Sequence, residues 1–258
     1  MPAMDVIVLQ SGSNGNCVYV EAGGVGLLFD AGIAGTAAQE RLHRHGRDIC
    51  SARAVVISHD HADHVRAVGI FQRKFGLQVC VTPATLARAA ERHALGKMDR
   101  PCYFRAGDVL RFDEVVVETI PTPHDGVDGV AFVIDDGHSR VGVLTDLGHV
   151  FEGLADVVAS LDAVVLESNY DPQMLKRSSY PEYLKGRIRG PRGHISNREA
   201  AELLASAAGP RLQWACLAHL SQENNRPELA LATHRAVLGA KLPLHVASRY
   251  DAAGIFAV

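Results

Sequence analysis

The feature that most constrains this chain is a short apolar strand that runs directly into a loop of potential metal ligands. Residues 54–57 read AVVI, a β-branched run typical of a buried strand. The next seven residues read SHDHADH and place four potential ligands in an H-x-H-x-D-H pattern: His59, His61, Asp63 and His64. Imidazole and carboxylate together suit Zn²⁺, or Mn²⁺ where oxygen ligands dominate. A polar surface loop without a metal is the alternative, and the density of ligands argues against it.

The spacing of these ligands indicates how they divide between two ions. His59 and His61 lie two positions apart in an extended loop, so their side chains project to the same side and can share one ion. Asp63 and His64 stand at the start of the next helical pattern. From there they can turn toward a second ion nearby.

Three more candidate ligands follow the ends of predicted strands. They are His124, Asp146 and His219. A carboxylate such as Asp146 can bridge two cations, and two metals about 3.5–4 Å apart can bind both the attacking and the leaving oxygen of a displacement. Either histidine taken alone is equally well explained as structural, but its position after the H-x-H-x-D-H motif favours a ligand role. The sequence therefore predicts hydrolysis with two divalent ions, Zn²⁺ or Mn²⁺, held by seven side chains: His59, His61, Asp63, His64, His124, Asp146 and His219.

The apolar pattern predicts an α/β fold in which strands come in clusters. Strands are expected at 6–9, 17–20, 25–29, 54–57, 79–81, 115–120, 130–134, 141–144, 163–166, 214–217 and 244–246, and helices at 36–45, 64–75, 84–94, 151–158, 197–207 and 227–238. This clustering disfavours a doubly wound sheet and favours two mixed sheets packed face to face, with helices on the outer faces. With 47% hydrophobic residues, we expect residues 1–258 to form a single domain.

Composition and charge narrow the classes of partner. The chain has 26 basic and 29 acidic residues, so no global positive field predicts nucleic-acid binding, and any such contact must come from a local patch. The first residues, MPAMDVIVLQ, lack the basic start of a signal peptide, and no apolar run approaches the roughly 18 residues of a membrane helix. The five cysteines form no C-x-x-C pair. We therefore expect a soluble, cytoplasmic protein without membrane contact.

Several motifs together resemble the metallo-β-lactamase superfamily, whose pattern is H-x-H-x-D-H followed by His, Asp and His at later strand ends. Within it, the sequence is similar to the YycJ/WalJ-type hydrolases of bacteria. The segments that carry this second resemblance are SGSNGNC at 11–17, TPHD at 122–125, TDLG at 145–148, ESN at 167–169, GHISN at 193–197 and HLSQENN at 219–225. The resemblance implies an αββα sandwich with a dinuclear site on one edge. It also implies phosphodiester cleavage of DNA, as a 5′-to-3′ exonuclease.

The GHISN segment also resembles ribonuclease Z, where the matching histidine lies beside the metals. By that resemblance His194 is the proton donor or a contact to the scissile phosphate, while a metal-bridging hydroxide attacks phosphorus. An imidazolium near a helix N-terminus can protonate a departing oxygen, so the role is physically reasonable. Asp63 can orient the attacking water as well as bind metal. The alternative for His194 is a capping or loop histidine.

Two segments are candidates for substrate binding. Residues 176–198 form a basic strip with Glu182 as its one acidic residue: Lys176, Arg177, Lys185, Arg187, Arg189, Arg192 and Arg198. Within this strip, Arg192 and Asn197 are predicted to contact substrate. The turn at 11–16 has two glycines and small donors, so Ser13, Asn14 and Asn16 are predicted to cradle a phosphate. An ordinary solvated surface and a plain hairpin turn are the respective alternatives, and 167–169 can brace the ligands.

Two other functions compete with a nuclease. A small-molecule hydrolase acting on thioesters, lactones or cyclic phosphodiesters would use the same metal site, because a fold does not fix a substrate. A non-enzymatic sensor or scaffold would not need a complete ligand set. Only 72 residues separate Asp146 from His219, too few for the extra domain of the β-CASP nucleases. The sequence also lacks a Gly/Pro-rich arm like that with which ribonuclease Z holds tRNA.

Overall fold

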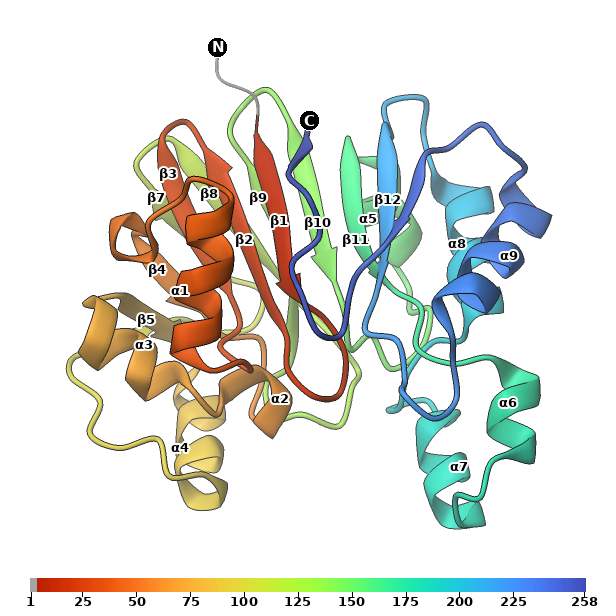
Figure 1. Cartoon of the computed structure of the whole chain (residues 1–258), viewed down its shortest axis with the longest axis horizontal. Helices are drawn as coiled ribbons and strands as arrows, with labels where there is room; N and C mark the ends of the chain where they lie inside the picture. Colours follow the sequence, from red (N-terminus) through yellow and green to blue (C-terminus); the bar gives the residue numbers. More distant parts are fainter. Residues whose placement is uncertain (1–3) are drawn as a thin grey trace.

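Two mixed β-sheets form the centre of the molecule in the computed structural model, which describes residues 4–258 (Figure 1). The first sheet has the strand order β14-β1-β2-β3-β4-β5-β6, and the second has the order β13-β12-β11-β10-β9-β8-β7. The strands of the first sheet are β1 (Asp5–Gln10), β2 (Cys17–Ala22), β3 (Val25–Phe29), β4 (Ala54–Val56), β5 (Gln78–Val81), β6 (Cys102–Tyr103) and β14 (Phe256–Ala257). Those of the second are β7 (Val109–Phe112), β8 (Val115–Pro121), β9 (Val130–Asp135), β10 (Arg140–Leu144), β11 (Ala163–Glu167), β12 (Trp214–Ala218) and β13 (Leu244–Val246).

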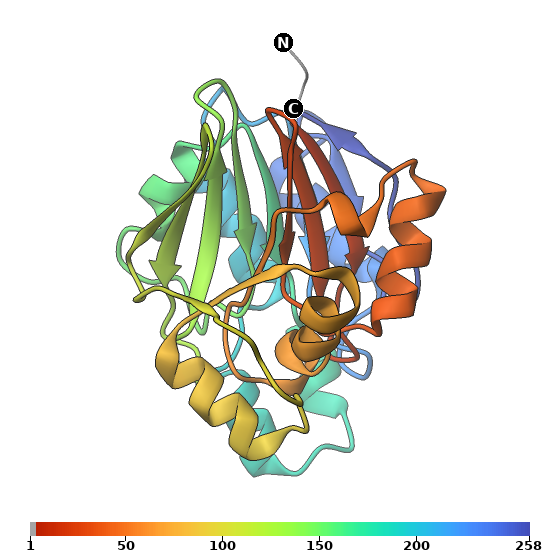
Figure 2. The same ribbon diagram turned by 90° about the vertical axis from the view of Figure 1, so that its left-hand side faces the viewer.

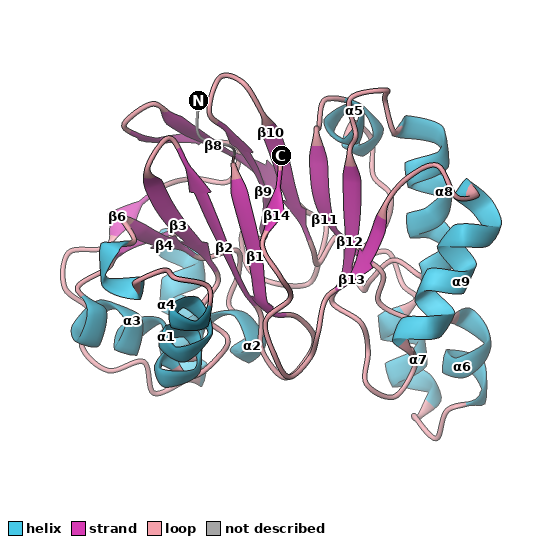
Figure 3. Ribbon diagram, turned by 45° about the horizontal axis from the view of Figure 1, so that its top comes forward, coloured by secondary structure: helices cyan, strands magenta, loops and turns pink. Residues whose placement is uncertain are grey.

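Helices cover the outer face of each sheet, so that the layers run helix, sheet, sheet, helix (Figure 2). The helices beside the first sheet are α1 (Gly35–Arg44), α2 (Ala62–Val65), α3 (Val68–Phe75) and α4 (Pro83–Arg92). The others are α5 (Leu154–Ala159), α6 (Pro172–Arg177), α7 (Glu182–Ile188), α8 (Asn197–Ala207) and α9 (Pro227–Leu238). A short 3-10 helix spans Ile49–Ser51. Figure 3 shows that α6 and α7 extend beyond the strands. The predicted αββα sandwich is confirmed.

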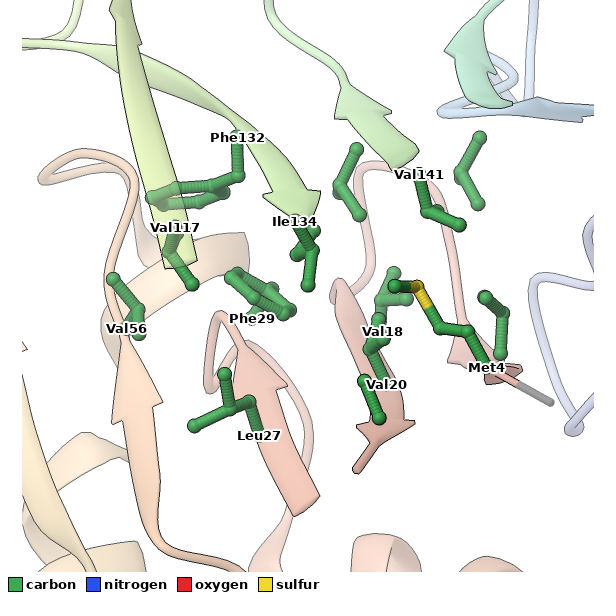
Figure 4. Packing of buried hydrophobic residues seen from close by; sticks show 14 of the residues in the cluster. Met4, Val18, Val20, Leu27, Phe29, Val56, Val117, Phe132, Ile134 and Val141 are labelled. Atoms are coloured by element: carbon green, nitrogen blue, oxygen red, sulfur yellow. The ribbon is translucent and has the colours of Figure 1, made fainter. Parts of the chain in front are cut away.

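The shared core lies between the two sheets, where alternate residues of each strand meet (Figure 4). Phe29 of β3 and Phe132 of β9 are fully buried, and their ring centroids lie 5.0 Å apart. Val56 and Val117 belong to the same cluster. Separate apolar clusters pack each sheet against its own helices. Because both faces of each sheet are buried, the central strands read as continuous apolar runs.

The parallel pairings direct the strand ends that matter to one edge of the sandwich. Strand β4 is parallel to β3 and β5. In the other sheet β10, β11 and β12 are parallel, and β8 shares their direction because β9 is antiparallel to both β8 and β10. The carboxyl ends of these strands therefore gather at one edge. In Figure 1 helices α2 and α7 lie beneath the strands at this edge.

The fold also shows how apolar its helices are and where its cysteines lie. No helix within residues 4–258 is long and apolar enough to cross a membrane. All five cysteines are free. Cys17, Cys80 and Cys216 are buried as small apolar groups, whereas Cys50 and Cys102 are exposed.

Candidate active site

The H-x-H-x-D-H segment leaves β4 and turns into α2, as its position after an apolar strand predicted. His59 is buried, and His61 immediately precedes α2, which carries Asp63 and His64. The loop after β3 packs against this turn at Gly32, where an added Cβ would lie 1.6 Å from the carbonyl oxygen of Asp63. Only glycine permits that approach. The loop after β3 therefore fixes the position of the turn that carries Asp63.

The seven predicted ligands lie together at the sheet edge. Their donor atoms form overlapping groups in which every atom lies within 4.8 Å of the others: His59 with His61 and His124, His59 with His64 and Asp146, Asp63 with His64 and His219, and Asp146 with Glu167, His194 and His219. Among the carboxylates of these groups, Asp146 alone belongs to two, as would be expected of a carboxylate shared by two ions. The structure thus brings all seven side chains to one place.

This donor set fits divalent cations. His59 Nε2 is buried in the cluster and has no hydrogen-bond partner among the described residues, and the contact of buried Asp146 Oδ2 is with His64 Nε2, 3.2 Å away. Buried polar atoms without partners are costly, so a ligand is needed to satisfy them. Imidazole nitrogens with carboxylate oxygens are the donors that Zn²⁺ and Mn²⁺ accept. The donor atoms of the cluster therefore fit a divalent metal ion.

A second protein group orients each of four histidines. His64 Nδ1 lies 2.7 Å from Asp30 Oδ2, and His59 Nδ1 lies 2.9 Å from Ser58 Oγ. His124 Nδ1 is 2.7 Å from the carbonyl oxygen of Gly193, and His219 Nδ1 is 3.1 Å from Asn169 Nδ2. Oxygen atoms beside Nδ1 of His64, His59 and His124 can accept its N–H and leave Nε2 unprotonated toward the cluster, whereas the Asn169 amide nitrogen donates to His219 Nδ1.

Three residues of this edge have backbone angles that non-glycine residues rarely adopt. Asp30, Asp146 and His219 have φ values of 64°, 57° and 54°. Asp30 and His219 directly follow the buried strands β3 and β12, and Asp146 lies two residues after the end of β10. Left-handed backbone at a non-glycine residue is unfavourable and persists only where the surrounding structure imposes it, typically at functional sites. The strand ends are therefore bent to aim these side chains.

His194 lies beside the cluster and is paired with a fully buried carboxylate. Its Nδ1 is 2.6 Å from Glu167 Oε1, and its ring stacks on that of His219 with centroids 5.3 Å apart. The other oxygen of Glu167 accepts the N–H of Leu147 at 2.9 Å. Burial alone would lower the pKa of His194, but the carboxylates of Glu167, Asp146 and Asp63 together outweigh burial and raise it. Its Nε2 is left free of this pairing.

Electrostatics prepare the cluster for a cation. Burial and the neighbouring His64 hold the pKa of His59 well below its usual value, so that this ring is neutral. Burial opposes ionisation of Asp146, yet His219 and His64 hold its pKa well below the ordinary range. His64 has a pKa raised well above normal, since Asp146 and Asp30 outweigh its burial. A neutral ring and an ionised carboxylate are the forms that bind a metal, and His64 must release its proton to do so.

Comparison with known proteins decides the family. The family model "Metallo-beta-lactamase superfamily" matches residues 11–219. The chain belongs to this superfamily. It is 33% identical to "Exodeoxyribonuclease YycJ" of Bacillus anthracis over 236 residues, covering 91% of this chain and 89% of that one. It is also 33% identical to "Exodeoxyribonuclease WalJ" of Streptococcus pneumoniae over 228 residues, covering 88% and 85%.

Solved structures share the superfamily fold. The metallo-β-lactamase fold protein YhfI of Bacillus subtilis superposes with a TM-score of 0.76 at 16% identity, covering 100% of both chains. The short form of human tRNase Z has a TM-score of 0.66 at 14% identity, covering 97% of this chain and 98% of that one. The superfamily fold implies divalent metal binding, and the chain is a metal-dependent hydrolase.

The three residues predicted to cradle a phosphate, Ser13, Asn14 and Asn16, differ in how far their side chains are accessible. Ser13 is exposed and lines the pocket in front of the cluster. Asn16 is buried, and its Nδ2 lies 3.0 Å from His64 Nε2 and 3.3 Å from the carbonyl oxygen of Asp63. Asn14 donates from Nδ2 to the carbonyl oxygen of Arg249. The structure therefore commits the side chains of Asn14 and Asn16 to internal contacts, and leaves Ser13 accessible.

The other two predicted substrate contacts are also separated by the structure. Asn197 is fully buried, and its Oδ1 accepts from Ser168 Oγ at 2.6 Å and from Asn225 Nδ2 at 2.8 Å. This side chain therefore braces the loops behind the cluster and does not face solvent. Arg192 is exposed, but the structure does not place it among the residues that line the pocket.

The basic strip is less positive in space than in sequence. Four of its seven members have acidic partners: Lys185 and Arg189 with Glu182, Arg187 with Asp125, and Arg198 with Glu202. Asp125 and Glu202 lie outside the strip, so a count of charges along the strip could not find them. Within the described residues, Lys176, Arg177 and Arg192 have no such partner.

A pocket of ≈ 390 Å³ opens onto the cluster. Its lining includes His61, Asp63, Asp146, His194 and His219 from the cluster. The surrounding walls come from the end of α4, from α7 and from the loops that carry Ser13 and Ser221. Lining residues beyond the cluster are Ser13, Ala62, Arg92, His93, Asn169, Tyr180, Leu184, Arg187, Ile188 and Ser221.

Sequence reasoning missed Asp30 and left Glu167 without a defined role. Both could have been found by the signal that identified Asp146, a carboxylate at the end of a buried strand. Asp30 comes directly after β3, and Glu167 ends β11. The predicted ligands included residues after later strands but not Asp30, which follows β3. The partner of Glu167 lies 27 positions away, so its role needed the fold.

Proposed function

We propose that this chain is a dinuclear metal-dependent phosphodiesterase that degrades DNA as a 5′-to-3′ exonuclease. The seven clustered side chains would hold two divalent ions, Zn²⁺ or Mn²⁺: His59, His61, Asp63, His64, His124, Asp146 and His219. When bound, these ions would supply an activated oxygen nucleophile and neutralise charge on the phosphate. The direction of degradation rests on the family resemblance alone.

His194 is the proposed proton donor, and its pairing with Glu167 is the observation that carries the proposal. Since Nδ1 is 2.6 Å from Glu167 Oε1, a protonated ring presents its remaining N–H at Nε2. Because the pKa of His194 is raised, the protonated form of the ring is favoured. Nε2 would then protonate the departing oxygen of the phosphodiester, or bind the phosphate as a charged donor.

Asp63 is the second proposed catalytic side chain. Its Oδ2 lies 3.4 Å from His219 Nε2, while about 20% of its side chain remains exposed to the pocket. A carboxylate in that position can bind a cation and also accept a hydrogen bond from the attacking water. Ser13 is the proposed contact to the phosphate on the same side, since it lines the pocket.

DNA as the substrate class is supported by two relatives named exodeoxyribonuclease, each 33% identical over most of this chain. The two matches cover 91% and 88% of this chain, which supports the single domain that we propose for residues 1–258. Lys176, Arg177 and Arg192 are the proposed contacts to the phosphates beyond the pocket, because they have no acidic partner in the described structure.

A small-molecule hydrolase is the second candidate, and one feature of the pocket favours it. The lining includes Tyr180, Leu184 and Ile188, an apolar surface that could receive an acyl chain as well as a nucleobase. Neutralisation of much of the basic strip also weakens the electrostatic argument for a polyanion. Thioesters, lactones and cyclic phosphodiesters are the substrates to compare.

One panel of substrates distinguishes the two candidates. Protein loaded with Mn²⁺ or Zn²⁺ is incubated with single- and double-stranded DNA and RNA labelled at either end, beside a chromogenic thioester and a phosphodiester dye. The proposal predicts that mononucleotides are released from the 5′ terminus of DNA and that a chelator stops the reaction. Intact nucleic acids with rapid thioester hydrolysis would establish the second candidate instead.

A further inference from the structure

One wall of the ≈ 390 Å³ pocket is an apolar surface formed by α7 and the residue that leads into it. Leu184 and Ile188 are four positions apart on α7 and therefore lie on the same face of the helix. Tyr180 lies just before the helix. All three are partly exposed, and all three line the pocket together with His194. We call these three residues the α7 wall.

The α7 wall is not part of the cores that stabilise the sandwich. None of its three residues belongs to the apolar clusters that the described part of the chain forms between the sheets or beneath the helices. Binding a metal or a phosphate requires polar donors, so neither task accounts for an apolar surface beside them. The wall is therefore available to an apolar part of a ligand.

Contacts on both sides hold α7 in position against the cluster. The guanidinium of Arg187 forms two hydrogen bonds to Asp125, at 2.6 and 3.0 Å. Asp125 lies 3.4 Å from His61, one of the proposed ligands. The carbonyl oxygen of Ile188 accepts the N–H of His194 at 2.9 Å. The same backbone therefore carries both the apolar surface and the proposed proton donor, so their separation is fixed.

We propose that the α7 wall receives the base of the terminal nucleotide while its phosphate lies at the metal cluster. This inference rests on the proposed nuclease function. An aromatic ring stacks any nucleobase, because every base has a π-face, and the aliphatic neighbours of the ring add apolar contact. The volume is near the lower end of the range for ligand pockets, which suits one nucleotide better than a longer run. The wall thus gives a preference for a terminal nucleotide that carries a base, without a sequence preference.

The test compares DNA whose terminal nucleotide is ordinary with DNA whose terminal nucleotide is abasic, made for each end. For wild-type protein loaded with Mn²⁺, we expect kcat/KM for the ordinary terminus to exceed that for the abasic one by roughly 5- to 100-fold, as stacking on one base supports. Leu184→Ala and Tyr180→Ala should bring this ratio toward one by slowing only the ordinary substrate. Tyr180→Phe keeps the ring and should retain the preference.

Tyr183→Ala is the matched control, since Tyr183 is on the same helix, 78% exposed and outside the pocket lining. It should leave the ratio unchanged. A binding measurement avoids turnover: calorimetry should show that dAMP binds wild type more tightly than deoxyribose 5-phosphate, and that Leu184→Ala removes the difference. If wild type cleaves both termini equally, the α7 wall has no such role although the nuclease proposal stands. If no DNA is cleaved at all, both proposals are wrong.

Discussion

At the scale of single residues, the site is defined by what holds each functional side chain. Asp30 engages His64, Asn169 engages His219 and Glu167 engages His194. None of these partners needs to touch a substrate. They fix which ring nitrogen faces the cluster, and an error of about 1 Å in that position can cost two orders of magnitude in rate.

Replacement of His194 tests the division between metal binding and proton donation. We expect His194→Ala to lower turnover on DNA by about 10²–10⁴ while metal content stays unchanged, because the variant loses only the group that protonates the leaving oxygen. Metal analysis and single-turnover kinetics on the same sample check both parts. His138→Ala, in the exposed hairpin between β9 and β10, is the control. Loss of metal from His194→Ala would instead give His194 a structural role.

Local sequence patterns predicted which side chains meet at the sheet edge, and predicted less well which side chains face solvent there, for a physical reason. A ligand at the end of a buried strand is identified by that strand, as for His124, Asp146 and His219. Asn197 carries no such signal, because a polar residue at the start of a helix can equally face solvent or brace a loop. Its two partners, Ser168 and Asn225, come from other segments of the chain and meet it only in the fold.

At the scale of elements, the long apolar strands and the amphipathic helices were predicted, and the short exposed elements were missed. Strands β6 and β14 have two residues each, and β7 is only partly buried. The predicted helix at 64–75 is two helices in the structure, α2 and α3. Helix α6 was missed although Asp171 caps it and Pro172 begins it, a standard start signal. The basic residues at its end were interpreted only as part of a charged strip.

Helix α9 provides a test of how a buried histidine affects stability. His234 is fully buried, and its Nδ1 lies 2.9 Å from the carbonyl oxygen of Ala230. Burial lowers the pKa of His234, so the unfolded chain binds a proton more readily than the folded one. The stabilising contribution is therefore complete above the unfolded pKa of about 6.5 and is lost as the pH falls below it.

Chemical denaturation of metal-free protein between pH 7.5 and 5 checks this expectation. Wild type should lose free energy of unfolding on acidification, and His234→Leu should lose less, by at most about 1.4 kcal/mol for each pH unit. The other histidines contribute equally to both proteins and cancel in the difference. Parallel curves for the two proteins would show that His234 does not contribute to acid sensitivity.

At the scale of the whole molecule, ion pairs formed by folding change how the chain should respond to salt. Seven basic residues in the strip at 176–198 would give a logarithmic salt slope of about −5 on single-stranded DNA if all contacted phosphates. Only Lys176, Arg177 and Arg192 lack acidic partners among the described residues, so we expect a slope of about −2. Binding measured between 50 and 200 mM salt checks this. A slope near zero would indicate a small substrate, and one near −5 would mean that the ion pairs open on binding.

The sandwich brings seven side chains from both sheets to one edge. The proposed function depends on these side chains binding two metal ions. The most direct test is metal analysis of chelator-treated protein reconstituted with Zn²⁺ or Mn²⁺ and then freed of excess ion. We expect close to two ions per chain in wild type and in His138→Ala, and fewer in Asp146→Asn, since Asp146 is the one carboxylate of the cluster that belongs to two of the donor groups. Wild-type protein that retains no metal after reconstitution would contradict the proposed function.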